Sequence, residues 1–205
     1  MLFSYKMKDD TGFAPNPFHG VLTLATYKPG IRETKRPGNY IAGFTSADLC
    51  GDRVGEERLL FIMKVTEKMN YDTYYNHPGF QIKKPTIESR LRKSGDNIYF
   101  KRDGDYKQGL NFFHIDDDSI RRDLKSDKVL VSKEFFYFGS GAIPVDKFKI
   151  NVPRYQSPYG VKTSNEKIVK DLWTYLDQNF QKNIALNPPH QWEEREVFNS
   201  LSGCR

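Results

Sequence analysis

Short strand-like segments separated by glycine and proline turns run through the first two-thirds of this chain, and they limit the folds that it can adopt. The segments are rich in β-branched and aromatic residues, which is typical of strands. Pro-Gly pairs at 29–30 and 37–38 each mark a turn between two such segments. The expected strands are residues 2–7, 20–27, 40–45, 59–66 and 129–138, the last divided into 129–132 and 135–138.

Helical patterns are few before residue 160. Asp72 can cap the N-terminus of a helical turn, and Pro78 ends whatever helix follows it. Residues 81–128 are polar and irregular, with strand-like islands at 95–100 and 109–115. A long region of this kind inside a compact domain is typical of a functional or mobile segment.

The clearest helix is predicted over residues 163–182. Thr163 and Glu166 have the spacing of a capping box at its start. The apolar residues that follow recur with a helical period and form one face: Ile168, Val169, Leu172, Trp173, Leu176 and Phe180. Strands first and a helix last favour an α+β fold, in which helices pack on a twisted, mostly antiparallel sheet. We expect these strands to form one sheet or barrel.

The order of elements over residues 35–75 resembles the central unit of PUA-like barrels, the group that includes the ASCH and EVE/YTH domains. A turn leads into a strand, a hairpin returns, and an aromatic-rich helical turn follows. The resemblance implies a barrel-like sheet with short helices and a C-terminal helix. Those families hold a nucleobase at the barrel mouth.

Charge and cysteine content point to an intracellular protein with anionic partners. The net charge of +6 favours nucleic acid, nucleotides or anionic surfaces, although many mildly basic proteins bind none of these. Cys50 and Cys204 are the only cysteines, and their spacing suggests neither a disulfide framework nor a metal site. We therefore expect a cytoplasmic protein, without a signal peptide or a membrane span.

Common catalytic motifs are absent, so no catalytic residue or cofactor is assigned from the sequence. His114 is the most notable of four scattered histidines, because aromatics and a carboxylate triplet flank it. The triplet at 116–118 could bind a divalent cation, but such a run more often caps a helix. We therefore predict no metal site, and we keep His114 as a candidate ligand-binding residue.

The stretch DDTGFAPNPF, residues 9–18, is the strongest candidate for a ligand loop. A pocket for a nucleobase needs aromatic planes and a polar group that reads the base edge. Phe13 and Phe18 could supply the planes, and Asp10 or Asn16 the edge contact. The alternative is that both rings fill the core while Asn16 shapes a turn.

Other candidates extend this site. Tyr5 on the preceding strand and Tyr75 on the short helical turn could wall the same cleft. Phosphate contacts are expected from four basic residues, namely Lys28, Arg32, Lys83 and Lys84.

Several separated motifs resemble one family, the second of the nucleotide modification associated domains. The motif D-x-G-F-A-P-N-P-F is present at residues 10–18, and T-L-A-x-x-K-P-x-I-R at residues 23–32. The likeness covers about residues 3–145. This suggests a nucleotide modification associated domain at 1–145 and a helical extension at 146–205 that packs on it. The family occurs in bacterial and phage gene neighbourhoods that are linked to base modification.

Two functions follow from this resemblance and from the residues. The first is recognition of a nucleobase or nucleotide, held in an aromatic cleft, in a nucleic-acid modification or phage-defence context. The second is an enzyme that modifies or processes a nucleobase or nucleotide. Both predict nucleic acid or a nucleotide as the partner, and protein partners stay open.

Overall fold

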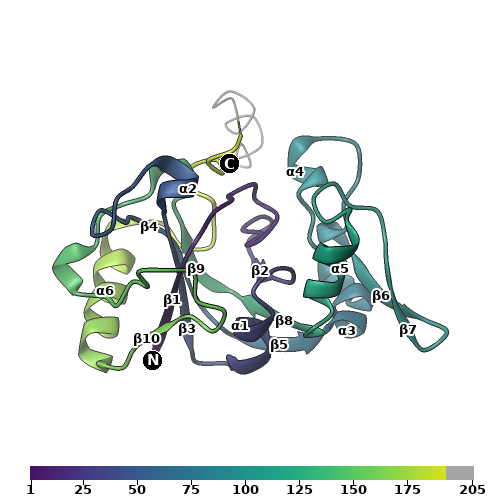
Figure 1. Cartoon of the computed structure of the whole chain (residues 1–205), viewed down its shortest axis with the longest axis horizontal. Helices are drawn as coiled ribbons and strands as arrows, with labels where there is room; N and C mark the ends of the chain where they lie inside the picture. The colour runs from purple at the N-terminus through teal and green to yellow at the C-terminus, as the bar shows by residue number, and fades with distance from the viewer. Residues whose placement is uncertain (193–205) are drawn as a thin grey trace.

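A five-stranded sheet is the largest element of the computed structural model, which describes residues 1–192 (Figure 1). Its strands β1 and β3 run parallel, and all other neighbours run antiparallel. The spatial order is β10 (Val161–Thr163), β1 (Leu2–Lys6), β3 (Tyr40–Phe44), β4 (Leu59–Lys64) and β9 (Glu134–Tyr137).

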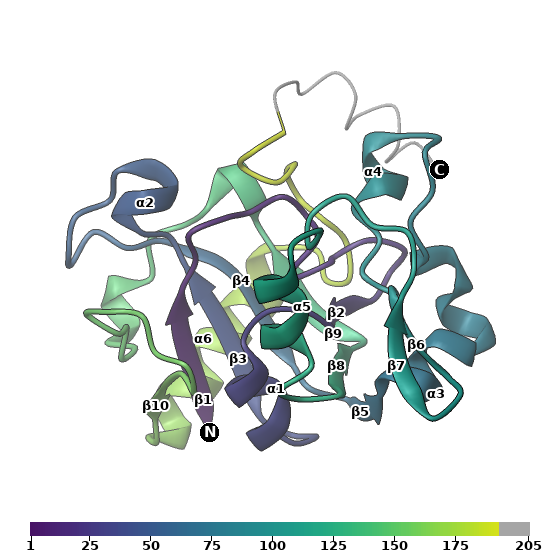
Figure 2. The same cartoon turned by 45° about the vertical axis from the view of Figure 1, so that its right-hand side comes forward.

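A smaller antiparallel sheet packs against the larger one. It consists of β2 (Leu22–Leu24), β8 (Lys128–Ser132) and β5 (Glu67–Asn70), in this order. A separate hairpin pairs β6 (Tyr99–Arg102) with β7 (Asp105–Gln108). Figure 2 shows this hairpin on the side of the smaller sheet.

Short helices connect these strands, and one longer helix follows them. The α-helices are α1 (Pro29–Thr34), α2 (Ala47–Cys50), α3 (Tyr71–Asn76), α4 (Arg90–Lys93), α5 (Asp117–Asp123) and α6 (Glu166–Asn179). The 3-10 helices are η1 (Pro78–Lys83), η2 (Gly139–Gly141) and η3 (Asp146–Phe148). Within residues 1–192, no helix combines the length and the hydropathy that a bilayer crossing requires.

The alternating faces of the strands explain why the elements stack in layers. On β9, Phe135 and Tyr137 face the smaller sheet, while Phe136 and the following Phe138 face α6. This alternation follows from the two-residue period of a strand. Each ring buried in this way stabilises the fold by about 1.5–3 kcal/mol. The larger sheet therefore lies between α6 and the smaller sheet (Figure 1).

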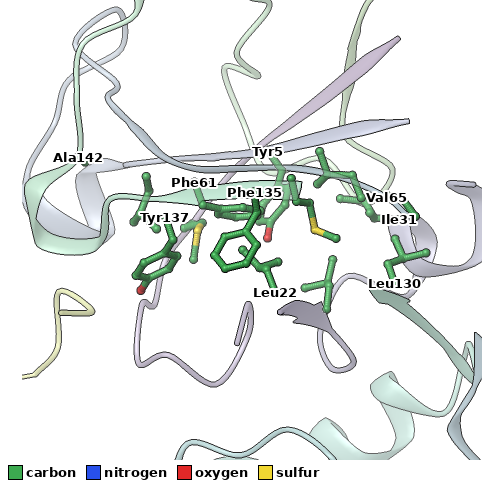
Figure 3. Packing of buried hydrophobic residues seen from close by; sticks show 14 residues of the cluster. Tyr5, Leu22, Ile31, Phe61, Val65, Leu130, Phe135, Tyr137 and Ala142 are labelled. Atoms are coloured by element: carbon green, nitrogen blue, oxygen red, sulfur yellow. The ribbon is translucent and has the colours of Figure 1, made fainter. Parts of the chain in front are cut away.

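The core between the two sheets lies directly beneath the end of β1. Figure 3 shows Tyr5 of β1 packed with Phe61, Phe135 and Leu22, which come from both sheets. The Tyr5 ring meets Phe61 edge-on at 6.0 Å between centroids. A third cluster fills the space between the smaller sheet, α3 and β6, and it includes Phe13, Tyr71 and Tyr74.

The prediction of one sheet was wrong. The segment 129–138 changes sheets after Ser132, so that β8 belongs to the smaller sheet and β9 to the larger one. The chain between β4 and β5 makes the same change. Across residues 1–192 the strands close no barrel. The protein is a mixed α/β structure with mainly antiparallel sheets and short helices.

Helix boundaries also differ from the sequence predictions. The N-cap of α3 is Asn70, whose Oδ1 accepts from the Thr73 amide at 2.7 Å, and Asp72 lies inside the helix. Helix α6 is capped by Asn165, while Thr163 ends β10. Near the start of each helix, more than one side chain can act as the N-cap. The local backbone conformation determines which of them does so. The expected helical turn and the late helix are both present.

Candidate functional site

A cavity of about 280 Å³ lies where β1 ends, beside the turn that leads from β2 into α1. Its polar and aromatic lining comes from distant parts of the chain: Tyr5, Lys6, Lys8, Asp9, Tyr27, Lys28, Arg122 of α5, and Gln156. We call it the cationic compartment, because lysine and arginine outnumber the single carboxylate in its wall, that of Asp9.

A second cavity of about 170 Å³ adjoins the first and shares Asp9, Ala14 and Tyr27 with it. Phe13 and Phe113 complete its aromatic walls, and their rings stack at 4.8 Å between centroids. We call it the aromatic compartment. The two compartments meet at Asp9 and Tyr27, so a planar ring and an attached anion could occupy them together.

The turn at Tyr27 and Lys28 has an uncommon backbone. Both residues have positive φ, 53° and 41°, which places two consecutive side chains other than glycine in the left-handed region. This region costs an ordinary residue about 1–2 kcal/mol. Such conformations cluster at functional sites, where the surrounding structure enforces them.

Buried polar contacts hold this turn from behind. The Tyr27 amide donates to Asp123 Oδ1 at 2.7 Å, and Arg32 Nε donates to the Tyr27 carbonyl at 2.7 Å. The other Arg32 nitrogens donate to the carbonyls of Asp123, Ser126 and Lys128. Arg32 is fully buried, so its role in the structure is to join the turn to α5 and the start of β8.

Asp123 is the centre of this buried cluster. Its carboxylate also accepts from Tyr99 Oη at 3.1 Å and lies 2.5 Å from His114 Nδ1. The His114 ring meets Tyr27 edge-on at 4.1 Å and Phe13 at 5.1 Å between centroids. Within residues 1–192, His114 Nε2 has no hydrogen-bond partner. His114 thus lies behind the rings of the aromatic compartment.

Lys28 is the half-buried cation of the cationic compartment. Its ammonium donates to Gln156 Oε1 at 2.8 Å and lies 4.8 Å from the centre of the Tyr5 ring. Burial, together with the nearby charge of Lys8, lowers the pKa of Lys28 to about 8. Within residues 1–192, no carboxylate lies within 4.0 Å of the Lys28 ammonium. An anionic ligand would supply the missing countercharge.

Tyr5 and Tyr27 differ in how they border the compartments. Tyr5 is almost fully buried, and its hydroxyl has no hydrogen-bond partner within residues 1–192. Its pKa is raised by burial and by the charge of Asp10. Tyr27 is only half-buried and borders both compartments. Tyr27 is therefore the ring that a ligand can reach from either side.

The loop residue Asn16 lies in a separate buried network. Its side-chain amide donates to the carbonyls of Gly12 and Ser94, and its Oδ1 accepts from Lys83 Nζ at 2.7 Å. Lys83 Nζ also donates to Val21 O and to Thr23 Oγ1. These contacts tie the loop at 9–18 to η1, and they leave both side chains almost inaccessible to solvent.

Asp96 extends that network at a distance from the compartments. Its carboxylate accepts from Thr23 Oγ1 at 2.6 Å and from Tyr74 Oη at 2.7 Å. Burial raises the pKa of Asp96, and the charge of Lys83 opposes this shift. Burial in turn lowers the pKa of Lys83 to about 8.

Asp10 and Phe18 contact the C-terminal part of the described chain. Asp10 accepts from Tyr137 Oη at 2.5 Å and from the His190 amide at 2.9 Å. The Phe18 ring stacks on Trp192 at 5.4 Å between centroids. Neither residue borders the two compartments.

Tyr75 and Lys84 lie together on another surface, beside the β6–β7 hairpin. The Lys84 ammonium is 3.5 Å from the centre of the Tyr75 ring, which packs on Phe100. Of the residues selected from the sequence, Tyr5, Phe13 and Lys28 line the compartments, and Arg32 and His114 lie behind them. The other six lie elsewhere: Asp10, Asn16, Phe18, Tyr75, Lys83 and Lys84.

Sequence reasoning missed most of the polar and aromatic lining residues of the two compartments: Lys6, Lys8, Asp9, Thr11, Tyr27, Phe113, Arg122 and Gln156. Tyr27 occupies a free position of the motif at 23–32, beside Lys28. That position before Pro29-Gly30 is the one signal that could have identified it. No local pattern marks Arg122 or Gln156, because only folding brings them to the end of β1.

Metal ligands do not gather near this site. Among residues 1–192 there is no group of three or more His, Cys, Asp or Glu side chains that could hold a metal ion. The carboxylate triplet instead begins α5, where Asp116 Oδ1 accepts from the Ser119 amide at 2.8 Å.

Comparison with known proteins identifies a family. The family model described as nucleotide modification associated domain 2 matches residues 1–196. No curated protein and no solved structure matches the chain.

Proposed function

The chain belongs to the nucleotide modification associated domain 2 family, and from this premise we propose that it recognises a nucleobase or nucleotide in a nucleic-acid modification context. The observation that supports this most is the junction of an aromatic and a cationic compartment at Tyr27. A nucleotide has the same two parts, a planar base and an anionic phosphate.

In this proposal the base lies in the aromatic compartment against Tyr27. Phe13 and Phe113, which stack on each other, line the same compartment, and Asp9 borders both compartments. A carboxylate accepts hydrogen bonds only, so Asp9 favours a base edge that carries an amino or imino donor. Stacking on one aromatic ring contributes about 1–3 kcal/mol to the binding of a base.

The phosphate lies in the cationic compartment and contacts Lys28. Hydrogen bonds to charged groups contribute about 1.5–3 kcal/mol, which corresponds to about 10–100-fold in affinity. Arg122 is exposed on the same wall, and within residues 1–192 it has no carboxylate partner. Its guanidinium can bind two phosphate oxygens at once.

Calorimetric titration of nucleoside monophosphates and of the matching nucleosides tests the proposal. We expect the monophosphates to bind at least tenfold tighter, and Lys28→Met to remove that difference. Lys84→Met is the matched control, because Lys84 also lies over a tyrosine ring but outside the compartments. Tyr27→Leu should weaken nucleosides and nucleotides alike. The proposal fails if no nucleotide binds, or if both Lys28→Met and Tyr27→Leu leave binding unchanged.

A specific contact also supports the alternative of an enzyme that processes a nucleobase or nucleotide. His114 is oriented by Asp123, as a general base is oriented by a carboxylate, and it touches two walls of the aromatic compartment. Chromatography of nucleotides after incubation with the protein tests this. A new product that His114→Gln abolishes, while binding persists, would favour the enzyme over the binding module.

A further inference from the structure

The cationic compartment adjoins two further cavities. On one side a cavity of about 270 Å³ near α2 shares Lys6, Lys8 and Gln156 with it. On the other side a cavity of about 610 Å³ along α1 and α5 shares Tyr27, Lys28 and Arg122 with it. Because neighbouring cavities share lining residues, the three adjoin one another, and together they offer more space than a single nucleotide needs. We call them together the groove.

The charges along this groove are mainly positive and unpaired. Two of its carboxylates are paired, Asp48 with Lys8 and Asp52 with Arg58. The other two, Asp9 and Glu33, have no cation within 4.0 Å among residues 1–192, but the lysines and arginines of the lining outnumber all four carboxylates. Lys6 pairs with Glu57 at its edge. Among residues 1–192, the cations in the groove without a carboxylate partner are Lys28, Arg53, Arg122, Lys125 and Arg154. A row of such cations suits a ligand with several phosphates rather than one.

Two exposed rings flank the centre of the groove. Tyr155 is 74% exposed and lines the cavity near α2, and Tyr159 is 57% exposed and lines the cavity along α1. Gln156, which receives the hydrogen bond from Lys28, lies between them in sequence. The Arg154 guanidinium lies 5.7 Å from the centre of the Tyr155 ring. Exposed rings beside free cations are the arrangement by which proteins bind unpaired bases.

Gly30 of α1 holds the Tyr159 side of the groove in place. A Cβ atom at this position would lie 2.8 Å from the Tyr159 ring and 2.7 Å from the Pro158 carbonyl oxygen. Only glycine therefore allows the segment that carries Tyr159 to pack this closely on α1. This close packing limits the positions that the exposed ring can take, which lowers the entropy lost when a base stacks on it.

We infer that the nucleotide held at Lys28 is part of a single strand of nucleic acid that runs along this groove. The inference rests on the proposed function and names its ligand. Flanking bases stack on Tyr155 and Tyr159, and successive phosphates contact the free cations. A duplex keeps its bases stacked inside and offers none to these rings, so the groove selects the single strand.

Fluorescence anisotropy with a labelled 12-nucleotide strand tests the inference, in DNA and RNA versions of one sequence. We expect the strand to bind at least 100-fold tighter than a mononucleotide and tighter than the corresponding duplex. The double variant Tyr155→Ala/Tyr159→Ala should weaken strand binding at least tenfold. It should leave mononucleotide binding unchanged, since neither ring lines the two compartments. A preference for either DNA or RNA supports the inference.

Three controls make the result specific. The double Tyr→Phe variant keeps both rings and should bind as the unchanged protein does. Phe112→Ala removes another exposed ring, on the loop before α5 and outside the groove, and should have no effect. Arg53→Ala and Lys125→Ala should each lower the salt dependence of strand binding by about one counterion.

The failure of the inference and that of the proposed function can be told apart. If mononucleotides bind through Lys28 but the strand binds no tighter, or if the duplex binds as well as the strand, the inference is wrong and the proposed function stands. If neither Lys28→Met nor Tyr27→Leu changes the binding of a mononucleotide or of the strand, both are wrong.

Discussion

Lys28 and Lys83 have the same lowered pKa, about 8, but opposite surroundings. In both cases burial is the main cause. The Lys83 ammonium donates to four oxygens of Asn16, Val21 and Thr23 and is enclosed. The Lys28 ammonium donates to one amide oxygen and borders an open compartment.

The difference shows that a buried lysine can serve either the stability of the fold or the binding of a ligand. Which role it has depends on how many of its hydrogen-bond donors are already used inside the protein. Lys83 has no free hydrogen to offer a ligand, because an ammonium group has only three donors. Lys28 keeps donors for an incoming anion. Variants can therefore separate a stability role at Lys83 from a binding role at Lys28.

The largest expected effect is a loss of stability when the buried contacts that hold the turn at Lys28 are removed. Asp123→Ala leaves the fully buried Arg32 without its nearest carboxylate, 3.9 Å away, and removes the acceptor for the Tyr27 amide. Removal of one partner from a buried charge pair costs about 3–5 kcal/mol in the free energy of unfolding. Urea denaturation measures this loss. Asp118→Ala, at a mostly exposed carboxylate of the same helix, should stay within about 0.5 kcal/mol of the unchanged protein.

The next effect separates the two lysines directly. Lys83→Met leaves the buried oxygens of Asn16 and Thr23 without a donor, so we expect a loss of about 2–4 kcal/mol in the free energy of unfolding. Nucleotide affinity, measured well below the melting temperature, should not change. If Lys83→Met instead keeps near-native stability but loses nucleotide binding, Lys83 is the lysine that contacts the ligand. The roles assigned to Lys28 and Lys83 would then be exchanged.

A third prediction uses pH. The phosphate binds the protonated form of Lys28, whose pKa is about 8 in the free protein. Nucleotide affinity should be highest near pH 7, be about halved at the pKa, and fall towards tenfold per pH unit well above it, as the ammonium loses its proton. Calorimetry from pH 7 to 9.5 measures this profile. Lys28→Arg keeps its charge throughout and should flatten the profile, and a profile that does not change would remove Lys28 from the contact.

The smallest expected effect concerns backbone strain. Lys28→Gly relieves a left-handed conformation that glycine adopts without cost, so stability should rise by up to about 1 kcal/mol. The same variant should lose nucleotide binding. A gain in stability with lost binding is expected where strain serves function, and thermal unfolding beside calorimetry measures both. A loss of stability would show that the contacts of the lysine outweigh the strain.

The sequence by itself determined the features that depend on local pattern. The aromatic run from Phe135 to Phe138 predicts a strand, and the period of Val169, Leu172 and Leu176 predicts a helix with one apolar face; both elements are observed. The motif at residues 10–18 identified the family that the family model confirms. These properties depend on neighbouring residues, whose spacing is fixed by the helix and strand periods.

Only the tertiary structure decided which polar residues face a cavity and which fill the core. Asn16 and Lys28 each precede a proline within a motif, yet Asn16 meets Lys83 across 67 residues and Lys28 meets Gln156 across 128. The division into two sheets also depends on pairings between distant strands. Burial and hydrogen-bond partners are long-range properties, since they depend on which segments fold together, and no local pattern of residues contains that information.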